Sequence, residues 1–191
     1  MRKGLVLYMF ILFQWMSLKS FSQDTLVLDE KSSDIYVRGE SSLGKWECFF
    51  PELEGHLIGV KDSSFFFINE LYIRIYAGSV KSPNGLVSIL APFYLRYFSY
   101  PYIEYKMNEV VFRENILQPL LVKATGLINI AGEMKGITLS AIGNIQDEQA
   151  IFSGHKQLEL ESFSISRILL PFSLLKLDNQ VTIFFKVVFK Q

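Results

Sequence analysis

The residues that could carry out chemistry are few, and they do not cluster. The chain has one cysteine, Cys48, and two histidines, His56 and His155, with no Cys or His partner at metal-ligand spacing. Cys48 precedes two phenylalanines, which favours a buried, inert thiol over a reactive one. A single cysteine cannot form an internal disulfide, so the sequence predicts neither a metal site nor a disulfide framework.

The acidic residues that could act as general acids or bases lie where we expect solvent. Glu104, Glu133, Glu159 and Glu161 fall on the polar positions of alternating segments. General acid–base catalysis needs titratable groups that converge, and the chain has no Gly-x-Ser-x-Gly nucleophile elbow. The sequence therefore predicts a protein that is not an enzyme and that carries no cofactor.

Two-residue alternation of apolar and polar side chains dominates the chain after the first 22 residues. In the last segment Val181, Ile183, Phe185 and Val187 share one parity, and Thr182 has the other. Such a segment is a strand with one buried face. Similar alternation marks the segments 71–76, 103–108, 128–130, 137–141 and 158–161. Many short strands separated by turn residues indicate an all-β sandwich or barrel.

One segment breaks this alternation. Pro83-Asn84-Gly85 is followed by apolar residues at helical spacing, which predicts a short helical segment near residues 83–98. We expect Ser82 to cap this helix, with Pro83 at its first position, and Pro92 to kink or end it.

The first 22 residues have the pattern of a secretory signal peptide. Arg2 and Lys3 precede an apolar run, residues 5–13, that is too short to span a bilayer, and cleavage is expected after Ser22. An uncleaved anchor is the alternative, and the polar residues after the run disfavour it. Cleavage leaves residues 23–191 as a single domain.

The charge of the expected mature chain excludes one class of partner. The whole chain has 19 basic and 19 acidic residues, and removal of the signal segment leaves 16 basic residues, for a net charge of about −3. No block of basic residues is present. The sequence therefore predicts no binding of nucleic acid.

Four short blocks, taken in order, resemble the YceI-like family of secreted lipid-binding proteins. They are Gly39-Glu40-Ser41-Ser42-Leu43-Gly44-Lys45-Trp46, Tyr100-Pro101-Tyr102-Ile103-Glu104-Tyr105, Ala124-Thr125-Gly126-Leu127-Ile128-Asn129-Ile130-Ala131-Gly132 and the segment from Asn179 to Lys190. The first block keeps the Ser-Ser-Leu and Trp of the family motif but has Gly44 and Lys45 where the family usually has His and Asp.

The resemblance implies both a fold and a function. The fold would be an extended, lipocalin-like antiparallel β-barrel of about eight strands with a short helical segment at one end. Its lumen would bind, store or transport a long amphipathic isoprenoid-type lipid, such as a quinone or polyprenyl chain. The location would be periplasmic or secreted. The expected partners are the lipid, a second copy of the chain in a homodimer and, transiently, a membrane.

The inward parity of the expected strands and the apolar face of the helix give the candidate ligand-binding residues. They are Trp46, Phe93, Tyr97, Ile103, Tyr105, Met107, Ile128, Ile130, Leu158, Leu160 and Ile183. Candidates for contact with the lipid head group at the mouth are Tyr97, Tyr100 and Tyr102. Alternation alone does not separate residues that line a tunnel from residues that fill a core.

Two other functions compete with lipid carriage. A filled barrel could act as an envelope interaction or stress protein, and outward, uncovered Phe66, Phe184 and Val188 would favour that hypothesis. A membrane β-barrel would need longer strands, an outward apolar face and a polar interior. The apolar parity is expected to face inward here, which disfavours the membrane hypothesis.

Overall fold

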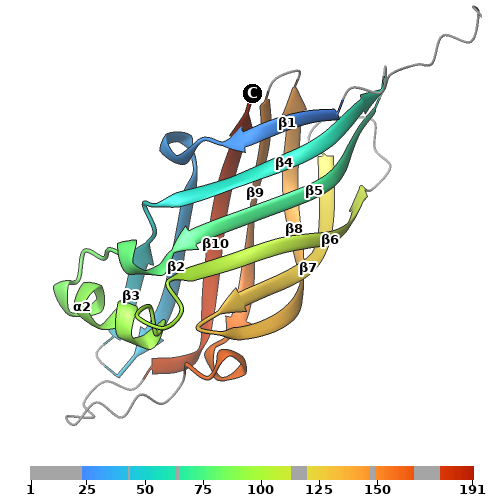
Figure 1. Cartoon of the computed structure of the whole chain (residues 1–191). Helices are drawn as coiled ribbons and strands as arrows, with labels where there is room; N and C mark the ends of the chain where they lie inside the picture. The colour runs from blue at the N-terminus through green and yellow to red at the C-terminus, as the bar shows by residue number, and fades with distance from the viewer. Residues whose placement is uncertain (1–22, 43, 63–64, 113–119, 147–148, 166–176) are drawn as a thin grey trace, which may run out of the picture.

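The structure is a computed structural model that describes residues 23–42, 44–62, 65–112, 120–146, 149–165 and 177–191, and the expected signal segment lies outside them (Figure 1). The strands are β1 Gln23–Leu28, β2 Asp34–Ser41, β3 Gly44–Phe49, β4 Leu53–Asp62, β5 Phe65–Tyr76, β6 Tyr102–Phe112, β7 Leu120–Ile130, β8 Glu133–Gln146, β9 Gln149–Glu159 and β10 Leu177–Lys190. The helical elements are α2 Gly85–Tyr94 and the 3₁₀ turns η1 Glu30–Ser32, η2 Ala77–Ser79 and η3 Leu160–Phe163.

Eight of these strands close into an antiparallel barrel, which confirms the predicted all-β fold. The order around the wall is β1-β4-β5-β6-β7-β8-β9-β10, and β10 returns to β1 (Figure 1). The closing seam is short, because only Val27 and Leu28 of β1 face Lys190 and Phe189 of β10. The β2–β3 hairpin pairs with the rest of β10 and extends the wall at one end.

The predicted alternation sets the two faces of the wall. In β7 the side chains of Val122, Ile128 and Ile130 are buried, whereas Leu121 and Leu127, which have the opposite parity, are exposed. Successive side chains of a strand point to opposite faces, so a barrel wall divides such a sequence into a lumen set and a solvent set. The main apolar cluster lies inside the barrel.

The hairpin between β7 and β8 shows why a glycine is needed there. Ile130 pairs with Glu133, which leaves Ala131 and Gly132 as a two-residue loop, both with positive φ (53° and 85°). This conformation matches the twist of an antiparallel hairpin. A Cβ atom at residue 132 would lie 2.4 Å from the Tyr100 ring, so the glycine also lets that ring cover the turn.

The helix forms where alternation stops, but its start differs from the prediction. Asn84, rather than Ser82, is the N-cap, and its side chain accepts a hydrogen bond from the backbone N–H of Leu86 at 3.0 Å. The Ser82 hydroxyl instead donates to the carbonyl of Glu47 in β3, at 2.6 Å. Pro92 lies inside the last turn of the helix, which ends at Tyr94.

The helix closes one end of the barrel. Figure 1 shows α2 beside the β2–β3 hairpin, and it contacts β3. Its buried side is formed by residues that also line the interior, among them Val87, Leu90 and Tyr94. No helix in the described residues is long and apolar enough to cross a membrane.

Candidate functional site

The barrel contains an apolar cavity of about 240 Å³. All of the barrel strands except β1 and β4 contribute to its lining, together with β2, β3, η3 and α2. An apolar cavity of about 150 Å³ is already large enough to bind benzene. The lumen therefore has room for an apolar molecule larger than benzene.

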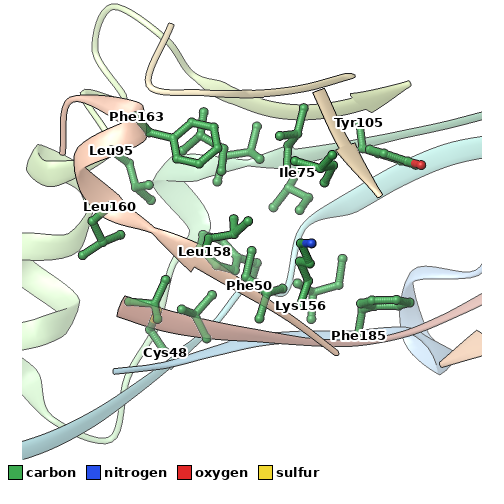
Figure 2. Close-up of a pocket in the computed structure, with 18 of the residues that line it drawn as sticks. Cys48, Phe50, Ile75, Leu95, Tyr105, Lys156, Leu158, Leu160, Phe163 and Phe185 are labelled. Carbon is green, nitrogen blue, oxygen red and sulfur yellow. The ribbon is translucent and has the colours of Figure 1, made fainter. Parts of the chain in front are cut away.

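Nine of the eleven predicted ligand-binding residues line this cavity. They are Trp46, Ile103, Tyr105, Met107, Ile128, Ile130, Leu158, Leu160 and Ile183. Most are almost fully buried, and Figure 2 shows Tyr105, Leu158 and Leu160 among the lining side chains. Their contact with a ligand remains a prediction, which this placement permits.

Phe93 and Tyr97 differ from the prediction, because the structure places both outside the cavity. Phe93 is exposed and packs against Phe98, with ring centroids 6.0 Å apart. The Tyr97 ring also lies on Phe98, at 4.0 Å. The face of α2 that enters the lumen carries Leu86 and Leu90 instead. Apolar residues surround this helix, so sequence spacing alone does not give its rotation about its axis.

The other tyrosines predicted at the mouth also stay out of the lumen. The ring of Tyr100 covers Gly132 at the β7–β8 turn. Tyr102 lies on the outer face of β6, where the Arg74 guanidinium is over its ring, 4.4 Å from the centroid. Neither residue lines the cavity.

The mouth of the lumen lies between the β2–β3 hairpin and α2. Lys45, Trp46 and Asn84 line both the cavity and a polar hollow of about 730 Å³ on the outer surface. The indole N–H of Trp46 donates to the carbonyl of Glu40 at 3.1 Å, which holds the ring at this entrance. A polar surface hollow and the apolar interior therefore meet beside one aromatic side chain.

Burial controls the ionisable groups inside the lumen. The Cys48 thiol is buried, as predicted, and burial raises its pKa to about 12, which favours the neutral form. Burial also raises the pKa of Tyr105 to about 12. The Tyr105 hydroxyl is buried and has no hydrogen-bond partner among the described residues.

Sequence reasoning missed one lumen residue that carries charge. Lys156 lies on β9 with the same parity as Leu158, and its side chain projects into the cavity (Figure 2). The signal was present in the alternation, because Phe152, Lys156 and Leu158 are separated by even numbers of residues. A lysine in an alternating segment is normally expected to face solvent, so the charge of Lys156 hides its inward parity.

The outer surface gives no support to the filled-barrel hypothesis at two of its three test positions. The Phe184 ring stacks on Tyr36, with centroids 4.9 Å apart, and Arg38 lies over it. Val188 is 2% exposed, and its backbone N–H donates a hydrogen bond to the Ser33 hydroxyl oxygen at 3.0 Å. The side chain of Phe66 lies outside the described residues.

The described residues of the lumen offer no cluster of metal ligands. Within the described residues no three His, Cys, Asp or Glu side chains group together as metal ligands. His56 instead lies on the outer wall, 3.3 Å from a Glu70 carboxylate oxygen. Binding is the chemistry that an apolar tunnel of this kind can perform.

Solved structures with the same architecture identify the fold. The chain matches BcnA of Burkholderia cenocepacia with a TM-score of 0.67 and 13% identity, over 84% of this chain and 98% of that one. It matches a polyisoprenoid binding domain from Saccharophagus degradans, implicated in plant cell wall breakdown, with a TM-score of 0.66 and 11% identity, over 86% and 97%. The YceI protein of Campylobacter jejuni matches with a TM-score of 0.56 and 20% identity, over 75% and 84%.

This chain has the YceI-like fold. The resemblance predicted from the four sequence blocks is thus confirmed for the architecture. No protein-family model matches the sequence, and neither does the sequence of any curated protein. The YceI-like barrel tolerates this divergence because its wall needs only alternating apolar residues and backbone pairing, which many sequences supply.

Proposed function

We propose that this protein binds a long amphipathic lipid of the isoprenoid type in the barrel lumen and carries or stores it outside the cytoplasm. The observation that supports this most directly is the continuous apolar cavity, which opens at Trp46 and is lined by side chains from most of the wall. The structural similarity to a polyisoprenoid binding domain supports the same ligand class.

Burial of hydrocarbon provides enough free energy for such a complex. Each buried CH₂ group contributes about 0.8 kcal/mol, so one five-carbon unit contributes roughly 3–4 kcal/mol. Association costs about 4–15 kcal/mol in lost freedom. A few isoprenoid units therefore exceed this cost, and polar contacts are needed only for the head group.

The outer face of α2 supports transient contact with a membrane. Ile89 of α2 is 64% exposed and Phe98, in the turn that follows α2, is 74% exposed, and Phe93 of α2 is exposed between them. This apolar surface adjoins the end of the barrel where the lumen opens. Apolar side chains that enter the interface of a bilayer would let the lipid move between membrane and lumen without crossing water.

The signal-like segment supports a periplasmic or secreted location. Residues 1–22 combine a basic start, a short apolar run and small residues before the expected cleavage point after Ser22. A quinone or polyprenyl chain is poorly soluble in water, so a carrier with an enclosed lumen would serve it in an aqueous compartment between membranes.

Two substitutions on one strand test the proposed function. Ile128 faces the lumen, and the adjacent Leu127 faces solvent. We expect Ile128→Trp to fill part of the tunnel and to reduce bound lipid strongly, while Leu127→Trp leaves it unchanged. Native mass spectrometry of residues 23–191, purified without detergent and then mixed with a polyprenol, measures both. Equal lipid binding by the two folded variants would exclude the lumen as the binding site.

A further inference from the structure

Lys156 introduces a positive charge into a lumen that is otherwise apolar. It pairs with Ile183 across β9 and β10, and both side chains line the cavity. The charged residues in the described lining are Lys156 and Lys45 alone. Lys45 is 87% exposed and lies 3.6 Å from a Glu40 carboxylate oxygen. The ammonium group of Lys156 has no ion-pair or hydrogen-bond partner within the described part of the chain.

The position of Lys156 explains how the protein tolerates this charge. Pairing between β8 and β9 stops at Ala141 and Gly154, two residues before Lys156. Beyond that point Ile137 and Leu139 of β8 line the cavity but are only half-buried. Lys156 is likewise half-buried. Its hydrocarbon stem can lie along the apolar wall while its ammonium group keeps contact with water at this opening.

The remaining polar groups of the described lumen, like Lys156, favour a ligand that accepts hydrogen bonds. The Tyr105 hydroxyl is a buried donor with no partner among the described residues, and no Asp or Glu is part of the described lining. The indole N–H of Trp46 is already engaged by Glu40. The lumen thus offers a positive charge and a free donor, and it has no carboxylate to neutralise them.

We propose that Lys156 binds the anionic head group of the lipid whose tail fills the lumen. The ligand would then be an acidic amphiphile, with a carboxylate or a phosphate head, rather than a neutral alcohol or quinone. This inference rests on the proposed lipid-binding function and narrows it to one ligand class. The head group would lie at the opening between β8 and β9, where it keeps part of its hydration, and the tail would extend along the barrel.

The size of the expected preference follows from the chemistry of the contact. A hydrogen bond to a charged group in a protein changes affinity by about ten- to a hundred-fold. A neutral head group of similar size could accept a hydrogen bond from Lys156 but would bring no opposite charge to it. We therefore expect an acidic lipid to bind at least about ten-fold more tightly than the alcohol with the same tail.

Matched pairs of lipids test this inference in the mature chain. Palmitic acid is compared with hexadecanol, and farnesyl phosphate with farnesol, by calorimetric titration at neutral pH and low salt. The acid of at least one pair should bind about ten-fold or more tightly than its alcohol. The pair with the larger ratio tells whether the head group is a carboxylate or a phosphate.

Three variants assign the preference to one side chain. Lys156→Met keeps an apolar stem of similar length but removes the charge. This variant should bind alcohols as tightly as the wild-type chain does, and it should bind acids no more tightly than alcohols. Lys156→Arg keeps the charge and should retain the preference. Lys45→Met, at the exposed mouth, should also retain it. Circular dichroism confirms that each variant is folded.

Each contrary result has a distinct meaning. Equal affinity for acid and alcohol in both pairs, or an acid preference that survives in Lys156→Met, would overturn this inference and leave the proposed function standing. Failure of all four lipids to bind the folded wild-type chain would overturn the proposed function and this inference with it.

Discussion

The indole ring of Trp46 lies across Gly39, its partner on the neighbouring strand of the β2–β3 hairpin. A Cβ atom at residue 39 would be only 2.4 Å from Cζ2 of the indole. A glycine in a strand interior commonly marks such a close approach. Because Gly39 has no side chain, the Trp46 ring can lie at the mouth of the lumen, where its indole N–H donates to the Glu40 carbonyl.

Gly39→Ala is expected to displace the Trp46 ring and to change lipid uptake. Overpacking of this kind costs about 1–3 kcal/mol of stability. After cleavage at residue 22, Trp46 is the remaining tryptophan of the chain, so its fluorescence reports on the mouth alone. We expect a shift of the emission maximum and a slower uptake of lipid. Gly136→Ala is the control, because no atom lies within 4 Å of a Cβ placed there.

The apolar surface on α2 leads to a prediction about rates rather than affinity. The double variant Ile89→Ser and Phe98→Ser should slow transfer of lipid from vesicles several-fold while the equilibrium affinity for the same lipid stays unchanged, since neither residue lines the lumen. Stopped-flow transfer from fluorescently labelled vesicles measures the rate. Val111→Ser, an exposed position toward the other end of β6, is the control. A normal transfer rate in the double variant would argue against membrane contact through α2.

The raised pKa values of two tyrosines lead us to expect that the free energy of unfolding falls in alkaline solution. Burial raises the pKa of Tyr105 to about 12, and burial together with the hydrogen bond to Glu104 raises that of Tyr72 to about 12. The unfolded chain ionises its tyrosines near pH 10. The stabilisation from the neutral forms is thus complete below about pH 10 and is lost as the pH rises toward about 12.

Replacing each tyrosine by phenylalanine separates their contributions. Tyr72→Phe removes a 2.6 Å hydrogen bond to Glu104 and should lower stability by about 1 kcal/mol. Tyr105→Phe removes a buried hydroxyl without a partner in the described residues, so stability should stay equal or rise. Urea unfolding between pH 8 and pH 12 measures both. A strong destabilisation by Tyr105→Phe would show that its hydroxyl has a partner.

Asp29, beside the closing seam of the barrel, leads us to expect that the free energy of unfolding falls in acid. The hydrogen bond from Lys190, followed by that from Ser32, lowers the pKa of Asp29 to about 2. The stabilisation from ionised Asp29 is present above about pH 4 and is lost as the pH falls through about 2. Lys190→Met should remove most of this pH dependence, as measured by urea unfolding. Lys186→Met, at an exposed position of the same strand, should retain it.

Much of the barrel follows from local pattern, and β10 shows why. Alternation from Val181 to Phe189 predicts one buried and one outer face, and this prediction needs only the two-residue period of a strand. Phe184 nevertheless lies half-buried on the outer face, because Tyr36 and Arg38 of β2 cover it. That cover depends on pairing across a long sequence separation, which alternation does not reveal.

The helix shows the limit of local pattern in another way. The stretch of apolar residues after Gly85 predicts a helix, and the structure contains one. Asn84 caps it, while the Ser82 hydroxyl accepts from the Asn84 backbone N–H and donates to the Glu47 carbonyl in β3. The outward rotation of Phe93 is likewise decided by how α2 packs on the barrel end.

The sequence by itself determined the all-β class, the inward parity of the strands and nine of the residues that line the lumen, because side-chain direction in a strand is a local property of the backbone. The tertiary structure alone decided where β8 and β9 part, and so made Lys156 a lumen residue at an opening rather than a solvated surface lysine. It also decided that the barrel interior keeps an apolar cavity. Closure and volume are set by pairing and packing among distant segments, which no short stretch of sequence contains.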